Sequence, residues 1–430
     1  MKIRHDELAI NGGPPVRAGN DWPTWPDYDK NTEESLIAAL RSSRWSVSWH
    51  STGRKSLERI FSENFAHYNN AKYCVSVDHG SSALVVALES LDIGPGDEVI
   101  VPVLTWVAPI TAVLRVGAVP VLVDVDPASG CITAEEISAA LTSRTKAVIV
   151  VHLACTVANL DDIRRVVYGV GVPIIEDCSQ AHGARWGTKR VGTVGDLGVF
   201  SLGAAKTLAG GEGGAVITDS LGRYSQLQML RADSRRYGYM DPEPGYPELV
   251  EDGAMMGANY CMPEFVAAVL MDQLGRLDEQ NEKRQARALQ LERALAGSQF
   301  NAIPVPEQVS SRAIYEFGIQ IEPEVLGEKS VHDFADAVSA ELGTKVYPPR
   351  VPLNRSVLLR PTTKNRYRDL WSTVIERGGL RESYKGAESY ARQTILFHHS
   401  ILLGDAQDAD DIAVALTKVA QFFSNEHSGM

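Results

Sequence analysis

Four groups of small or polar residues follow apolar, strand-like runs in this 430-residue chain, and their types could bind an anion and hold a carbonyl compound. The first group, Asp78-His79-Gly80-Ser81-Ser82, follows the run 73–77 and opens a helical pattern. Small residues at the start of a helix leave backbone N–H groups available for a phosphate, which the helix dipole also favours. A serine-capped helix without a ligand explains the same residues and is the commoner case.

The second and third groups contain an aromatic ring and a carboxylate. Trp106 lies just past the run 98–102, where a flat ring can stack on a planar cofactor but more often only packs. Asp177 follows Glu176 at the end of the run 172–176. A buried carboxylate is costly without a cation or hydrogen-bond donor, and no partner for Asp177 is evident nearby in the sequence. A helix cap or an exposed loop explains Asp177 equally well on this feature alone.

The fourth group places Lys206 after the small residues Gly203-Ala204-Ala205 and before the glycine-rich segment 210–214. This order excludes a Walker phosphate loop, in which the lysine follows the glycines and precedes Ser or Thr. A lysine in a tight, uncharged setting has a lowered pKa and can form an imine with an aldehyde. Most lysines are merely solvated, so this interpretation depends on the other three groups.

Taken together, the four groups match what pyridoxal phosphate requires of a protein. They would supply a phosphate site, a ring-stacking aromatic, a carboxylate that keeps the pyridine nitrogen protonated, and a lysine for the aldehyde. Ligands of open α/β sheets bind at the carboxyl ends of the strands, where all four groups fall. We therefore predict a pyridoxal phosphate site, with no metal.

The elements that must position these residues follow an alternating pattern. Apolar, β-branched runs separated by helical periods are typical of a mostly parallel sheet with helices on both faces. The predicted strands are residues 73–77, 98–102, 119–125, 147–152 and 172–176, and the helices between them are 82–91, 106–116, 134–141 and 160–167. The runs 198–202 and 215–218 lack a full helix between them and could pair as neighbours in the same sheet.

Three regions are expected along the chain. Residues 1–30 form a proline-punctuated arm that can be neither regular helix nor central strand, and we expect it to lie across another surface. Residues 31–297 form a large cofactor-binding domain, which opens with a helix capped by Asn31 and Glu34 and ends in a long helical pattern. Residues 298–430 form a smaller α/β domain with strand-like 313–321 and helices at 331–342 and 408–422.

Composition excludes several classes of protein. The chain is 44% hydrophobic and carries a formal net charge of -12, which disfavours a dedicated nucleic-acid binder. No run approaches the roughly 18 apolar residues of a membrane span, and no apolar signal core opens the chain, so a cytoplasmic protein is expected. The cysteines form no CxxC pair and suggest neither disulfides nor a zinc site. They are Cys74, Cys131, Cys155, Cys178 and Cys261.

Beyond these inferences, the motifs resemble those of the DegT/DnrJ/EryC1/StrS family of sugar aminotransferases, over nearly the whole chain. The resemblance lies in 80–84, 105–108, Glu176-Asp177-Cys178-Ser179-Gln180-Ala181-His182-Gly183, and Ser201-x4-Lys206-x5-Glu212-Gly213-Gly214. Segments 8–13, 22–26, 257–262, 277–280 and 347–349 are most similar to the aminocyclitol branch, which uses glutamine and scyllo-inosose or its 2-deoxy form.

The resemblance implies a fold-type I pyridoxal phosphate enzyme, with a mostly parallel seven-stranded sheet, a smaller C-terminal α/β domain and an extended N-terminal arm. It implies that Lys206 and Asp177 are catalytic, since Lys206 would bind the cofactor's aldehyde and shuttle a proton while Asp177 pairs with the ring nitrogen. It further implies ring contacts from Gln180 and Trp106, phosphate contacts from Ser81, Ser82 and Ser201, and a homodimer in which Asn259 reaches the neighbouring subunit's phosphate.

The implied reaction transfers an amino group from L-glutamine or L-glutamate to a keto-cyclitol or keto-sugar through pyridoxamine phosphate, in aminoglycoside or related metabolism. Two alternatives stay open: another reaction of the same cofactor, such as dehydration of a sugar, and a catalytically silent member. Trp49, His79 and Ala154-Cys155-Thr156 depart from the family pattern, and some of these positions line the acceptor side in the family. His398-His399 could approach the substrate, although an adjacent pair is more often structural.

Overall fold

The computed structural model describes residues 7–18 and 22–427, with side chains as far as residue 424. Its largest sheet has seven strands, and each strand is one of the predicted apolar runs with both ends within two residues. All neighbours run parallel except β9, which is antiparallel to both β1 and β8, so the last two runs do pair. The spatial order is β1 (Tyr73–Val77), β9 (Gly214–Thr218), β8 (Leu197–Ser201), β5 (Ile174–Asp177), β4 (Thr145–Val151), β2 (Glu98–Pro102) and β3 (Val119–Val123).

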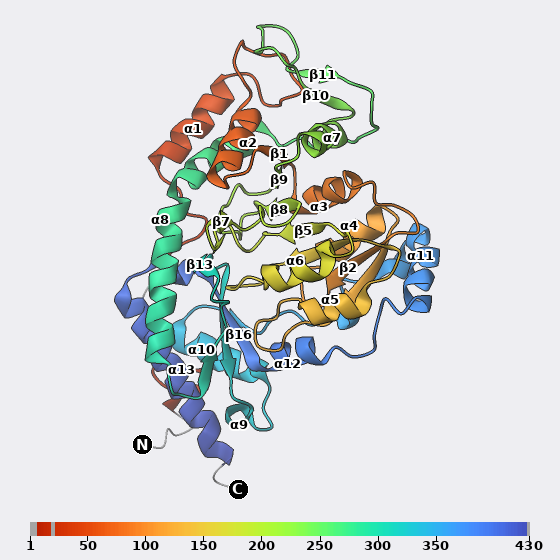
Figure 1. Ribbon diagram of the computed structural model, residues 1–430. Helices are drawn as coiled ribbons and strands as arrows, with labels where there is room; N and C mark the ends of the chain where they lie inside the picture. The colour runs from red at the N-terminus through yellow and green to blue at the C-terminus, as the bar shows by residue number, and fades with distance from the viewer. Residues whose placement is uncertain (1–6, 19–21, 428–430) are drawn as a thin grey trace.

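Both faces of this sheet are buried under helices (Figure 1). Successive side chains of a strand point to opposite faces, and in β2 Val99 and Val101 enter one core while Ile100 enters the other. The first core is covered by α3 (Gly80–Glu89), α4 (Ala108–Arg115) and α7 (Leu221–Arg231). The second is covered by α2 (Leu57–Tyr68), α5 (Ala134–Ala140), α6 (Leu160–Tyr168) and the first turns of α8 (Glu264–Ala294).

A second, antiparallel sheet follows the long helix α8. Its apolar face packs against α10 (Val331–Leu342) and α13 (Ala406–His427), where Phe317 and Phe397 join the same core as Phe334. The strand order is β12 (Phe300–Ala302), β14 (Glu316–Ile321), β16 (Thr394–His398) and β15 (Val346–Tyr347). The helices of this region are α9 (Pro323–Leu326), α10 (Val331–Leu342), α11 (Asn365–Glu376), α12 (Lys385–Gln393) and α13 (Ala406–His427), with 3-10 turns at Leu353–Arg355, Pro361–Thr363 and His399–Leu403.

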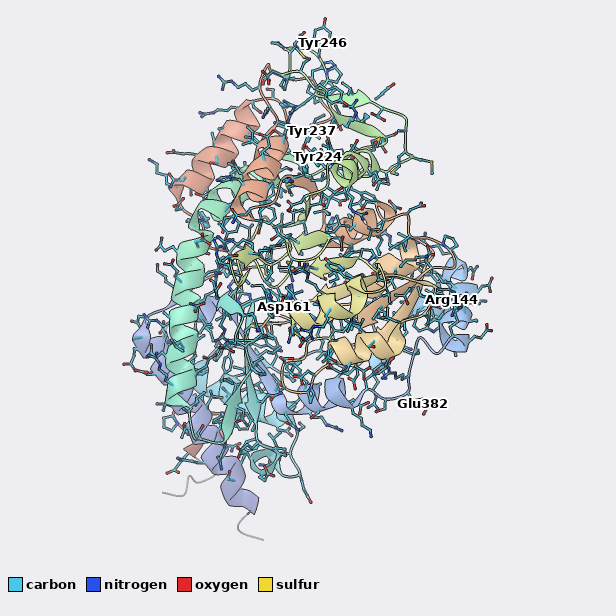
Figure 2. All side chains as sticks on the ribbon, in the orientation of Figure 1. Arg144, Asp161, Tyr224, Tyr237, Tyr246 and Glu382 are labelled. Carbon is cyan, nitrogen blue, oxygen red and sulfur yellow. The ribbon has the colours of Figure 1, made fainter. Side chains whose placement is uncertain are left out.

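Short strands complete the fold outside the two main sheets. β13 (Val309–Ser311), β6 (Arg185–Trp186) and β7 (Lys189–Arg190) form one small sheet, and β10 (Arg235–Tyr237) pairs with β11 (Leu249–Glu251). Figure 2 shows Tyr237, the last residue of β10, close to Tyr224 of α7, with Tyr246 at the far edge of this region. Arg231 and Glu58 form a fully buried ion pair of 3.1 Å, and Tyr237 Oη donates a hydrogen bond of 2.5 Å to Glu58.

The described part of the N-terminal arm lies across other surfaces of the molecule, as expected. It includes a 3-10 turn at Ala9–Asn11, and Trp22 Nε1 donates to Leu342 O at the end of α10 (2.8 Å). The arm then leads to α1 (Lys30–Arg41), which packs beside α8 (Figure 1). The predicted Asn31 cap is wrong. Asp29 accepts from the backbone N–H groups of Asn31 and Thr32 (2.8 and 3.2 Å), and Thr32 closes the capping box.

Two expectations from composition can be compared with this structure. Within the residues it describes, no helix is long and apolar enough to span a membrane. Four of the five cysteines are buried, and none of the five forms a disulfide.

Candidate active site

A cavity of about 430 Å³ opens at the carboxyl ends of the central strands. It lies where β1, β5 and β8 give way to loops, and residues from the antiparallel sheet close its other side. Six of the predicted site residues line it together: Ser81, Trp106, Asp177, Gln180, Ser201 and Lys206.

The N-terminus of α3 forms one end of this cavity. The first hydrogen bond within α3 runs from Ala83 N to His79 O (3.0 Å), so the N–H groups of residues 80–82 have no acceptor inside the helix. The N-cap residue, His79, makes no side-chain capping bond. Gly80 lets this helix end approach β8 closely, because a Cβ there would lie only 2.6 Å from Ser201 Cβ. The donors and the Ser201 hydroxyl therefore face the same space.

Asp177 ends β5 with its side chain in the cavity. The residue is only 5% exposed, and its Oδ1 accepts a hydrogen bond from Ser179 N (3.1 Å). In the described part of the chain, no arginine or histidine forms an ion pair with this carboxylate. The described residues therefore give Asp177 a hydrogen-bond donor but no ion pair with arginine or histidine, and the carboxylate faces a cavity that can hold a cationic group.

Lys206 enters the cavity from the loop after β8. Its Nζ lies 4.2 Å from the centre of the Tyr315 ring. Burial lowers the pKa of this amine, the negative charges of Asp177 and Glu316 oppose that effect, and Arg350 adds to it. A lower pKa leaves more of the amine neutral at a given pH, and only the neutral form can act as a nucleophile or accept a proton.

Trp106 and Gln180 both line a smaller recess beside this cavity. The Arg350 guanidinium lies over the Trp106 ring, 4.1 Å from its centre, so one face of the indole is covered by a cation. Gln180 Oε1 accepts a hydrogen bond from Ala154 N (2.6 Å). That contact leaves the amide Nε2 as the group that can donate toward a ligand.

The sequence reasoning did not identify Tyr315, Glu316 and Arg350, although all three line the cavity. Glu316 is buried, which raises the pKa of its carboxyl, and it accepts a hydrogen bond from Tyr347 Oη (3.0 Å). A carboxylate within the apolar run 313–321 was an available signal. The position of Arg350 had no such signal, because the residue lies in a loop and reaches the site only through the tertiary fold.

A second cavity of about 180 Å³ adjoins the first and shares Trp106, Gln180, Glu316 and Arg350 with it. Tyr347 and Tyr390 belong to its remaining wall. This recess therefore combines aromatic rings with hydrogen-bonding and charged groups, a lining suited to a small polar molecule beside the larger ligand.

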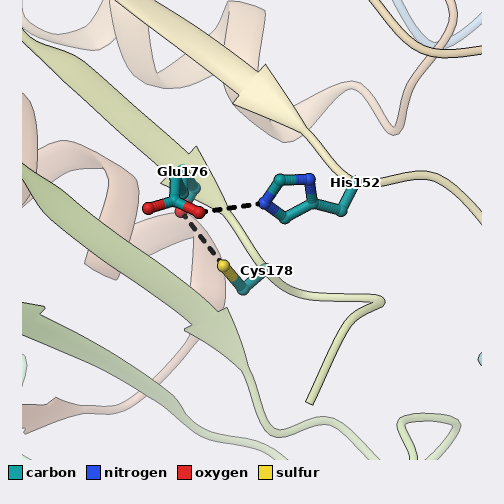
Figure 3. A group of neighbouring side chains, drawn as sticks. All are labelled: His152, Glu176 and Cys178. Atoms are coloured by element: carbon teal, nitrogen blue, oxygen red, sulfur yellow. Dashed lines mark hydrogen bonds and ion pairs between the residues drawn. The ribbon is translucent and has the colours of Figure 1, made fainter. Parts of the chain in front are cut away.

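Glu176, the neighbour of Asp177, points to the other face of the sheet and has a structural role (Figure 3). Its carboxylate accepts from the N–H groups of residues 192, 194 and 195 at 2.5–2.8 Å. His152 Nδ1 accepts from Ala158 N, so its Nε2 carries the proton that is donated to Glu176 (3.1 Å). Cys178 Sγ lies nearby, but these contacts occupy the carboxylate and argue against a metal there.

Two predicted residues do not line the cavity of their own chain. Ser82 is buried in the first turn of α3, where only its backbone N–H faces the helix end. Asn259 is exposed on the segment before α8, and its Oδ1 accepts from Cys261 N (3.2 Å). Its role in a neighbouring subunit stays a prediction. Of the paired histidines, His399 has a structural contact: it is fully buried and donates through Nε2 to Ala205 O (3.2 Å).

Comparison with known proteins gives consistent similarities. Residues 27–371 match the sequence profile of the DegT/DnrJ/EryC1/StrS aminotransferase family. The chain is 42% identical over 412 residues to the L-glutamine:2-deoxy-scyllo-inosose aminotransferase of Streptoalloteichus tenebrarius, covering 96% of this chain and 97% of that protein. It is 40% identical over 412 residues to the L-glutamine:scyllo-inosose aminotransferase of Streptomyces griseus, with the same coverage.

The same architecture occurs in solved structures. An aminotransferase from Psychrobacter cryohalolentis superposes with a TM-score of 0.80 at 27% identity, covering 95% of this chain and 100% of that one.

Proposed function

Because this chain belongs to the DegT/DnrJ/EryC1/StrS aminotransferase family, it is an aminotransferase, and we propose that it moves the amino group of L-glutamine or L-glutamate to a keto-cyclitol or a related keto-sugar. The donor and acceptor are proposed from the names of two relatives at 40–42% identity, which share nearly the full length of this chain. Aminoglycoside or related secondary metabolism is the proposed setting.

One observation carries the proposal. A buried carboxylate without an arginine or histidine partner, Asp177, and a buried amine, Lys206, face one cavity whose end is the uncapped N-terminus of α3. A ligand that carries an anionic group, a basic ring nitrogen and an aldehyde satisfies all three at once.

The residues therefore fit pyridoxal phosphate. The N–H groups of residues 80–82 and the Ser201 hydroxyl would hold the phosphate, and the close approach that Gly80 permits keeps these donors together. Asp177 would hold the ring nitrogen, while Gln180 and Trp106 would contact the ring. When bound, the cofactor accepts electrons released as the substrate loses a proton.

The protein's own contribution to the reaction is to move that proton. Lys206 is the proposed base, because its amine lies in the cavity and burial favours its neutral form. Tyr315 packs against this amine, and Glu316 lies across the cavity with Tyr347 as its hydrogen-bond donor. The adjoining recess, lined by Trp106 and Arg350, is the proposed place for the substrate.

Three further features complete the proposal. The enzyme is a homodimer whose subunits share their sites through Asn259. It has the three regions 1–30, 31–297 and 298–430, of which the last follows the end of α8. It acts in the cytoplasm.

The test uses purified protein loaded with pyridoxal phosphate. Addition of L-glutamine alone is expected to convert the visible absorbance of the bound cofactor and release one equivalent of the corresponding keto acid. Addition of scyllo-inosose or its 2-deoxy form is then expected to restore the spectrum and yield an aminocyclitol by mass spectrometry. A spectrum that responds to neither glutamine nor glutamate contradicts the proposal, and a dehydrated product without amine indicates the alternative reaction.

A further inference from the structure

The carbonyl groups of the loop that carries Lys206 are held by side chains from outside the central sheet. Trp25 Nε1, in the N-terminal arm, donates to both Ala204 O (3.0 Å) and Lys206 O (3.2 Å). His399 Nε2, which follows β16 of the antiparallel sheet, donates to the carbonyl between them, Ala205 O (3.2 Å). Three consecutive carbonyls are thus fixed from outside the sheet.

The indole of Trp25 is itself held in place. It packs edge-on against the His399 ring, with ring centres 4.6 Å apart and an interplanar angle of 83°. On another side the guanidinium of Arg284, a fully buried residue of α8, lies 5.2 Å from the indole centre. Among the residues that the structure describes, the two terminal nitrogens of Arg284 donate to amide oxygens only, Asn281 Oδ1 and Gln280 Oε1. Its charge is thus left available to attract the electron-rich ring.

The N–H groups of the same loop are also held, one by the glycine-rich segment and one by the loop itself. Ala204 N donates to Gly211 O (2.8 Å), and Lys206 N donates to Gly203 O (2.9 Å). Fixing both the N–H and the carbonyl sides of successive peptide groups sets the direction in which the Lys206 side chain leaves the backbone. A small error in that direction, multiplied along a four-carbon side chain, displaces the amine from the Tyr315 ring.

We propose that Trp25 is a positioning residue for Lys206, so that the N-terminal arm is a working part of the active site. This inference rests on the proposed function only in taking Lys206 as the reactive amine. Trp25 acts through its N–H on the loop backbone, and it orders the amine between the groups that face it. Those groups are Asp177 from β5, Glu316 from β14, Arg350, Tyr315 and His182.

The test compares two tryptophans of the same arm. Trp25→Phe removes the N–H that reaches the lysine loop. Trp22→Phe is the matched control, because Trp22 also donates an indole N–H to a backbone carbonyl, but at Leu342, outside the site. In both apo variants and the wild type, the pH dependence of Lys206 acetylation is measured by peptide mass spectrometry.

A loosened loop lets water reach the amine, so its pKa returns toward the ordinary value. The midpoint of the Lys206 profile is therefore expected to move up by about 0.5 pH unit or more in Trp25→Phe and to stay unchanged in Trp22→Phe. In the loaded enzyme, kcat for Trp25→Phe is expected to fall about 10-fold with KM for glutamine within about two-fold of wild type.

Identical Lys206 profiles in the two variants and the wild type overturn the proposal. If Trp25→Phe does not fold, benzothienylalanine at position 25 keeps the ring system and removes only the N–H. The pH dependence of Lys206 acetylation is then measured in that variant, and a midpoint equal to the wild-type value overturns the proposal. Absence of a cofactor adduct on Lys206 in the wild type defeats the proposed function, whereas the apo profile still reports on the positioning by Trp25. The two failures are therefore distinguishable.

Discussion

Two adjacent carboxylates at the end of β5 have opposite roles because a strand alternates its side chains between the two faces of the sheet. Glu176 is saturated by three backbone N–H groups and His152, whereas Asp177 faces the cavity with an oxygen available for a ligand. The pattern predicted a costly carboxylate at this point, and strand alternation was enough to place the two on opposite faces. Which face holds the cavity could not be predicted, because that depends on the helices packed on each side.

His182, in the same segment as Glu176 and Asp177, shows how burial changes the protonation of a single side chain. Burial lowers the pKa of His182 to about 3, while Lys206 adds to that effect and the hydrogen bond to Ser201 O opposes it. The folded protein therefore resists protonation that the unfolded chain accepts below about pH 6.5. The stability that His182 contributes is present above about pH 6.5 and is lost as the pH falls toward 3.

We therefore predict that His182→Gln weakens the acid dependence of stability. The amide can still donate to Ser201 O and accept from the Thr207 hydroxyl, so these contacts are retained. Between pH 6.5 and 5, the variant is expected to lose less stability than wild type, by up to about 1.4 kcal/mol per pH unit. Thermal unfolding at stepped pH measures this, with exposed His67→Gln as control. Parallel slopes for all three proteins would falsify the assignment.

At the scale of elements, the contact between α3 and β8 decides whether the phosphate site keeps its shape. We predict that Gly80→Ala weakens cofactor binding about 10-fold, because the new Cβ would meet Ser201 at 2.6 Å and push the helix end away. Absorbance titration with pyridoxal phosphate gives the Kd.

The control for this change is another helical glycine, Gly275 of α8, which has open space around its Cα. Gly275→Ala is expected to leave the cofactor Kd unchanged and to stabilise the fold by about 0.5–1 kcal/mol. Equal cofactor affinity in both variants and wild type would show that the approach of α3 to β8 does not shape the site.

The sequence predicted the seven central strands because each is a short, continuous apolar run buried on both faces, and its length and β-branched residues, rather than a period, separate it from a helix. The two-residue strands β6 and β7 were not predicted, since a pair of residues carries no period. The first helix begins at Lys30 with Asp29 as its N-cap, two residues before the cap that the pattern indicated. Asp29 brings a negative charge to the helix N-terminus, and the Thr32 side chain returns a hydrogen bond to the backbone of Asp29.

At the scale of the whole molecule, the cavity is assembled from three parts of the chain. The central sheet supplies Asp177 and Lys206, the antiparallel sheet supplies Glu316, and the arm contacts the lysine loop through Trp25. Asp177 and Lys206 could be predicted as site residues because each follows a strand that the sequence predicts. The contributions of Arg350 and Trp25 could not be predicted, because nothing in a single sequence relates positions so far apart. Glu316 carried one signal, a carboxylate within an apolar run, but nothing in the sequence placed it at this cavity.

Subunit hybrids test whether the sites are shared across a dimer. Lys206→Ala and Asn259→Ala subunits, each nearly inactive at limiting cofactor, are mixed and allowed to exchange. If Asn259 serves the neighbour's site, each mixed dimer regains one intact site, and activity is expected to recover to about a quarter of wild type. No recovery, despite hybrids detected by native mass spectrometry, places Asn259 within its own subunit or outside the site.

The central claim is that Lys206 holds the cofactor covalently, and borohydride reduction of the loaded protein tests it most directly. Lys206→Ala, which we expect to fold normally and lose turnover by about 1,000-fold or more, is the control. After reduction and digestion, mass spectrometry is predicted to find one pyridoxyl adduct per chain, on the peptide that contains Lys206, and none in the control. An adduct on another lysine, or no adduct at all in the wild type, would contradict the account.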